Sequence, residues 1–197
     1  MSAKRKMSTR KLTVTGMMIA ITMILTYTSL GIIPLQPVSA TIAHIPTIII
    51  AILEGPIVGA ITGCAFGIVS MIKAITAPSG VLDPCFINPI VSVFPRILIG
   101  LVSGYSYIML HKVFKKTMSS AVISAALGSL TNTLGAMGLM YLIYAKSFLT
   151  EKFGESAGSV VWGIITTYGI VEMVAAVVIC TAVVVAMKKA FYARAAA

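Results

Sequence analysis

Long runs of apolar residues without charge dominate this chain. The clearest run, Thr117–Ala145, contains no Asp, Glu, Lys or Arg. Over the whole chain 58% of residues are hydrophobic and only 10% are charged, whereas a soluble globular domain has about 25% charged residues. We therefore expect an all-α integral membrane protein that passes several times through the cell membrane.

Six apolar runs follow one another along the chain. A helix of about 20 residues crosses a bilayer, and the second run is shorter than that. Pro34 and Pro37 separate the first two runs, because proline blocks a helix interior. We expect one domain, residues 1–197, with six transmembrane helices: Leu12–Ile33, Val38–Leu53, a third ending at Lys73, a fourth starting at Pro89, Thr117–Ala145 and Ala157–Met187.

Clusters of basic residues predict the orientation of these helices. The net charge is +10, and most of the 15 Lys and Arg lie in the tail 1–11, the loop 111–116 and the stretch 188–194. Short basic clusters next to apolar runs mark cytoplasmic segments that face an anionic leaflet of the lipid bilayer. We therefore expect both termini in the cytoplasm. The same clustering argues against nucleic acid as a partner.

One fixed positive charge lies inside the otherwise apolar segment Phe86–Gly104. An arginine at this place, Arg96, costs at least about 2.5 kcal/mol in hydrocarbon unless it faces a protein interior or a wet cavity. Ser92 and Gly100 lie four residues to either side, so one continuous helix would place all three on the same face. Arg96 either pairs with Glu172 to hold two helices together or binds a ligand, and we favour the ligand.

Three polar or aromatic side chains of the last two spans accompany Arg96. They are Asn132, Tyr168 and Glu172, and we expect all four to line one cavity that opens outward and holds a small solute. Glu172 is expected to be paired or protonated, because an isolated carboxylate is costly at that depth. His44, in the second span, is either a ligand contact or a structural imidazole, and we favour the structural interpretation.

The segment Ala77–Asn88 is the longest irregular stretch before the fourth helix. It contains two prolines and a glycine, residues that interrupt regular structure. Loops of this kind often carry function on a rigid scaffold. We expect it to be an outer lid or a binding loop over the cavity.

Small residues predict where helices approach one another closely. Glycine recurs every four residues along the third span, at Gly55, Gly59, Gly63 and Gly67. This spacing leaves one helix face without side chains, for contact within the protein or with another subunit. Gly16 and Ala20 form a similar pair of small residues, four positions apart, on the first span.

Several kinds of chemistry are not indicated. The chain has no Gly-x-x-x-x-Gly-Lys-Ser/Thr motif, so it has no such site for ATP. The three cysteines have no metal-ligand spacing, and His44 and His111 lie on different spans, so we expect neither a cofactor nor an enzyme. An ion-coupled secondary transporter, with Glu172 or Asp83 as the ion site, is an alternative, although the sequence shows no paired halves.

Three motifs carry a resemblance to a known family. They are His44-Ile45-Pro46, Glu54-Gly55-Pro56-x-x-Gly59, and the segment from Asn88-Pro89 through Ser92 to Pro95-Arg96 and Gly104. In this order, on six short spans, they resemble the substrate-binding S components of energy-coupling factor (ECF) vitamin transporters. The Asn-Pro to Pro-Arg segment is most similar to the pantothenate-type members.

The resemblance implies a function and partners. A member binds a vitamin near the outer surface, and a membrane scaffold subunit with two ATPases powers its uptake. Pantothenate is the expected substrate, with riboflavin or folate as alternatives, and Asn88 and Ser92 join the expected binding residues. The docking motif of the family, Ala-x-x-x-Ala, corresponds here to Gly16-x-x-x-Ala20.

Overall fold

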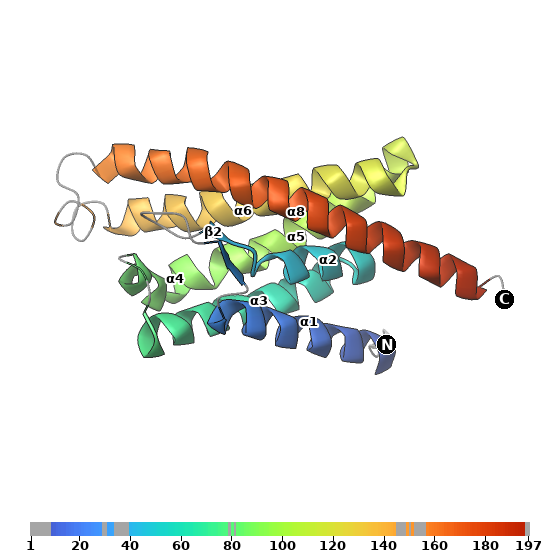
Figure 1. Cartoon of the computed structure of the whole chain (residues 1–197), viewed down its shortest axis with the longest axis horizontal. Helices are drawn as coiled ribbons and strands as arrows, with labels where there is room; N and C mark the ends of the chain where they lie inside the picture. The colour runs from blue at the N-terminus through green and yellow to red at the C-terminus, as the bar shows by residue number, and fades with distance from the viewer. Residues whose placement is uncertain are drawn as a thin grey trace, which may run out of the picture.

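A computed structural model describes residues 9–28, 31–33, 40–78, 80, 82–144, 149, 151 and 157–195 (Figure 1). Its elements lie side by side as one elongated helical bundle. In chain order they are α1 (Thr9–Tyr27), β1 (Ile32–Ile33), β2 (Ala40–Thr41), α2 (Ile45–Glu54), α3 (Pro56–Thr76), the 3₁₀ helix η2 (Asp83–Ile87), α4 (Pro89–Ser92), α5 (Phe94–Phe114), α6 (Thr117–Tyr144) and α8 (Ala157–Ala195).

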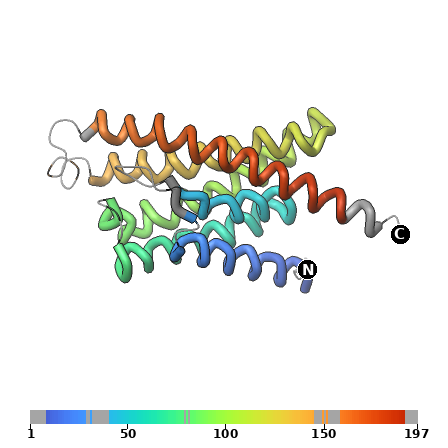
Figure 2. The backbone as a smooth tube through the Cα atoms, in the orientation of Figure 1, coloured from blue at the N-terminus to red at the C-terminus, as the bar shows by residue number. Residues whose placement is uncertain are grey.

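The successive long helices of the bundle alternate in direction (Figure 2). The beginning of α1 and the end of α8 lie at the same end (Figure 2). Among the described residues, four segments are long and apolar enough to cross a membrane, namely Pro56–Thr76, Pro89–Phe114, Thr117–Tyr144 and Gly158–Ala190, and α2 is a shorter apolar helix. The expected apolar, all-α architecture is confirmed, apart from two strands of two residues each.

The first two spans differ from their expected bounds. The expected helix Leu12–Ile33 ends at Tyr27, and Ile32 and Ile33 instead pair antiparallel with Thr41 and Ala40. The second helix, expected from Val38, begins only at Ile45; Val38 itself lies outside the described residues. Pro46 explains this start, because its missing N–H and fixed φ suit the first turn of a helix.

The fourth helix is broken where a continuous one was expected. It starts at Pro89 as predicted, but α4 ends at Ser92 and α5 begins at Phe94. Pro95 is the cause, since it has no N–H to donate to the carbonyl of Val91, four residues earlier. Arg96 Nη1 donates to that carbonyl instead, at 3.0 Å. Ser92 and Arg96 therefore lie on separate helices rather than on one uninterrupted face.

The glycine repeat of α3 packs inside this protein. A Cβ atom added to Gly63 would lie 2.0 Å from the carbonyl oxygen of Arg96, and one on Gly67 would lie 2.5 Å from Val93 Cα. A Cβ on Gly100 of α5 would lie 2.1 Å from the carbonyl carbon of Gly59. Three of the four glycines thus let the backbones of α3 and its neighbours touch.

The tight turn expected at Glu54-Gly55-Pro56 is confirmed. Gly55 has a φ of 105°, which side chains disfavour, and Pro56 begins α3. Lys11 Nζ lies 3.2 Å from Glu54 Oε2, an ion pair that ties the start of α1 to this turn. Both segments therefore lie at the end of the bundle where the chain begins and ends.

Candidate functional site

A cavity of about 300 Å³ lies among α3, η2, α5, α6 and α8. The end of α1 and strand β2 also contribute to its wall. Four of the predicted site residues line it together: Arg96, Asn132, Tyr168 and Glu172. Each is at least nine-tenths buried. The structure thus brings together side chains that lie up to 76 positions apart, counted from Arg96 to Glu172.

Arg96 is held by groups from three elements. Its Nη1 donates to the carbonyl of Val91, its Cζ lies 5.6 Å from the ring centre of Phe66 on α3, and the ring centre of Phe86 on η2 is 5.1 Å away. Its Nε lies buried without a hydrogen-bond partner among the described residues. A buried donor left unpaired costs about 1–3 kcal/mol, so an acceptor placed beside this N–H would be stabilising.

Glu172 is held by partners other than Arg96. Its Oε1 accepts from the backbone N–H of Thr41 at 2.7 Å, and its Oε2 accepts from Thr133 Oγ1 at 3.0 Å. No carboxylate oxygen of Glu172 lies within the 4.0 Å of an ion pair with Arg96. Both charged side chains line the same cavity, but no direct ion pair between them joins α5 to α8.

Asn132 offers an acceptor to the cavity. It lies on α6 directly before Thr133, and its Oδ1 is buried without a hydrogen-bond partner among the described residues. Tyr168, one turn before Glu172 on α8, lines the same space. The wall therefore combines a guanidinium donor with an amide acceptor, as a solute with an anionic group and a hydroxyl or amide N–H requires.

Three predicted site residues lie outside the cavity wall. Ser92 Oγ donates to the carbonyl of Gly67 at 3.0 Å and so joins α4 to α3. Asn88 Oδ1 accepts from the N–H of Ile90 at 2.9 Å and caps α4. His44 is fully buried at the start of α2, with neither ring nitrogen bonded to a described residue. Their part in binding remains a prediction.

Other residues of the wall were missed by sequence reasoning. Thr41, Phe66, Lys73 and Thr133 line the cavity without having been expected there. Gly80, Leu82, Asp83 and Phe86 also line it, and they belong to the segment Ala77–Asn88 that was expected to cover it. The backbone N–H of Thr41 leaves no signal in a sequence. Thr133 could have been noted as a hydroxyl next to Asn132. No group of three or more His, Cys, Asp or Glu gathers as a metal site among the described residues.

Comparison with known proteins decides the family. The family described as the substrate-specific component of the ECF transporter matches residues 10–184. This chain belongs to that family. The resemblance drawn from its motifs is thereby confirmed, and the protein is a multi-pass protein of the cell membrane that serves vitamin uptake with an ECF module. The family is one of transport components and not of enzymes.

A curated relative has a similar sequence. The pantothenic acid transporter PanT of Lactococcus lactis subsp. cremoris (strain MG1363) is 28% identical over 168 residues. The match covers 78% of this S component and 80% of the relative. The similarity therefore extends over most of both chains rather than over one motif.

Proposed function

We propose that this S component binds pantothenate, or a closely related small anionic vitamin, in the cavity beside Arg96. A membrane scaffold subunit and two ATPases then drive its uptake. The observation that carries the proposal is the buried guanidinium of Arg96, which lines the cavity and forms no ion pair within 4.0 Å with a carboxylate of the described residues. The named relative, a pantothenic acid transporter, supports the same substrate.

The free edge of Arg96 suits a carboxylate. Nη1 already donates to the Val91 carbonyl, whereas Nε has no described partner. Nε and Nη2 present two parallel N–H bonds, the arrangement that holds a carboxylate through both oxygens. The carboxylate of pantothenate would satisfy the buried Nε and neutralise the charge. The hydroxyl and amide groups of the same molecule match Asn132 and Tyr168.

The cavity faces the outside in this proposal. The chain crosses the membrane six times, and the basic end with both termini lies in the cytoplasm. The end of the bundle that holds α4, the end of α6 and the start of α8 is then the outer end (Figure 1). Vitamin enters past the segment Ala77–Asn88, several residues of which line the cavity.

The test is the selectivity of purified protein for the acid over its neutral alcohol. Arg96→Gln removes the charge but keeps an amide N–H for the Val91 carbonyl. A charge-assisted hydrogen bond contributes about 1.5–3 kcal/mol, so we expect more than a tenfold loss of affinity for pantothenate and little change for the alcohol. Arg96→Lys should restore affinity only in part, because lysine lacks the planar pair of donors.

The matched control is Lys73→Gln, which removes a cation from the cavity wall without touching the buried guanidinium. It should keep the preference for the acid. If the Arg96→Gln protein folds and still selects the acid as strongly as the wild type, Arg96 only caps the broken helix, and the pantothenate proposal fails.

A further inference from the structure

Phe86 is the one aromatic contact of Arg96 that comes from the irregular segment between α3 and α5, among the residues described there. Its ring centre lies 5.1 Å from Arg96 Cζ, and the side chain lines the cavity. The other aromatic contact, Phe66, belongs to the long helix α3 and is 4% exposed. The guanidinium is therefore held partly by a rigid helix and partly by a short segment over the cavity.

The faces and the edge of a guanidinium make different kinds of contact. Aromatic rings attract its faces, whereas its N–H bonds point outward in the plane. The hydrogen bond to Val91 fixes the position of Nη1 but does not by itself fix the guanidinium plane, so contacts with the rings are needed to fix its orientation. A carboxylate that accepts from Nε and Nη2 needs that plane in one orientation, because bidentate bonds are directional.

Resting on the proposed function, we propose that Phe86 is a positioning residue for anion recognition, which fixes the guanidinium plane of Arg96 so that its Nε edge faces the ligand. Cys85 beside it is 1% exposed and packs with Leu82 and Val91 in one apolar cluster. This packing anchors η2, so the ring has a fixed place from which to act. Phe86 thereby makes selectivity for acids depend on the segment that covers the cavity.

The first test measures binding of pantothenate and of its alcohol. Phe86→Leu keeps the apolar bulk and removes the ring. We expect about three- to thirtyfold weaker binding of the acid, with binding of the alcohol almost unchanged. Phe86→Tyr should restore the acid preference. Ile87→Ala, an exposed neighbour on the same 3₁₀ helix, should leave both affinities as in the wild type.

A double-mutant comparison separates positioning from simple covering. Added to Arg96→Gln, Phe86→Leu should cause no further loss of acid binding, because the group it positions is absent. An equal loss for acid and alcohol, or additive losses in the double variant, would mean that Phe86 only covers the cavity, and the inference would be overturned.

A measurement without ligand keeps this inference separate from the proposed function. In protein labelled with ¹⁵N-arginine, the Nε–H resonance of Arg96 is assigned by its absence from Arg96→Gln. The ring current of Phe86 should shift it, so it should move in Phe86→Leu and stay in Ile87→Ala. An unmoved resonance contradicts the inference. A moved resonance in a protein that does not bind pantothenate leaves the positioning intact and removes the substrate proposal.

Discussion

The carbonyl of Val91 loses its helical partner because Pro95 has no N–H, and Arg96 Nη1 takes that place at 3.0 Å. The residue after the proline thus repairs the break that the proline makes. The same contact leaves Nε buried and unpaired at the cavity. Under the proposed function, the same side chain would bond the backbone with one nitrogen and the ligand with another.

The backbone of Arg96 is placed by a glycine on the facing helix. A Cβ on Gly63 would lie 2.0 Å from its carbonyl oxygen, so Gly63→Ala forces α3 and α5 apart. We expect a loss of about 1–3 kcal/mol in the free energy of unfolding, as for other overpacked cores. Thermal unfolding in detergent measures it.

The matched control is Gly138→Ala on α6, where no atom lies within 4 Å of the added Cβ. Here alanine should stabilise the helix by up to about 1 kcal/mol. Equal shifts of the unfolding midpoint in the two variants would show that the close approach of α3 and α5 does not affect the free energy of unfolding.

At the scale of the elements, long apolar runs were predictable and irregular segments were not. The helices α3, α6 and α8 were predictable because each comes from an apolar run long enough to cross the hydrocarbon core of a bilayer. The ladder between β1 and β2 was missed, because Ile32 and Ile33 are as apolar as the helix before them. Hydrophobicity alone cannot separate a short strand from the end of a helix.

The polar residues of the candidate site were predictable from the sequence, but their hydrogen-bond partners were not. Arg96, Asn132 and Glu172 stand out because polar groups are costly in apolar spans. One of the partners of Glu172 is a backbone N–H on β2, which no side-chain pattern reveals. The break at Val93 could have been expected from Pro95, but its consequence, an arginine bonded to Val91, required the coordinates.

Helix α1 has two unlike faces. Its buried residues are all threonines, Thr15, Thr22 and Thr26, and each hydroxyl donates to the carbonyl four residues earlier. Gly16 and Ala20 are exposed, and no atom lies within 4 Å of a Cβ added to Gly16. The pair Gly16 and Ala20 is thus accessible to another helix, which fits the docking role that the first-helix motif predicts.

Leucine at Gly16 or Ala20 should block vitamin uptake by cells that contain the ECF module. Binding by the isolated protein should stay unchanged, because the added side chain meets a partner helix and not this bundle. Uptake assays and binding to purified variants measure the two effects. Ile21→Leu, on the same helix and already large and exposed, is the control that should transport normally. A parallel loss of binding and uptake would assign both residues to internal packing.

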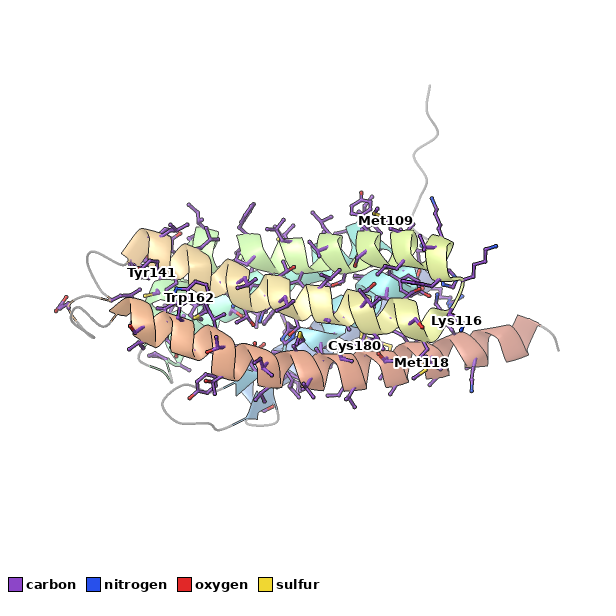
Figure 3. All side chains as sticks on the ribbon, turned by 90° about the horizontal axis from the view of Figure 1, so that it is seen from above. Met109, Lys116, Met118, Tyr141, Trp162 and Cys180 are labelled. Carbon is purple, nitrogen blue, oxygen red and sulfur yellow. The ribbon has the colours of Figure 1, made fainter. Side chains whose placement is uncertain are left out.

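For the molecule as a whole, the two ends of the bundle differ in composition. Tyr141 and Trp162 lie at one end of α6 and α8, and Lys116 and Met118 lie at the other (Figure 3). The ion pair between Lys11 and Glu54 joins the start of α1 to the end of α2. Trp and Tyr favour both membrane interfaces, whereas basic residues favour the cytoplasmic side, so the end with Lys116 is predicted to face the cytoplasm.

That orientation predicts which positions an impermeant maleimide reaches in intact cells. The test uses a variant without the native cysteines, Cys64, Cys85 and Cys180, into which one cysteine is reintroduced. Glu151→Cys, within the chain segment between α6 and α8, should react from outside. Lys116→Cys, at the exposed turn between α5 and α6, should react only after the membrane is permeabilised. Because the cavity lies toward the end marked by η2, the opposite labelling would open it to the cytoplasm. An uptake protein that receives its vitamin from outside could not then bind it in this cavity.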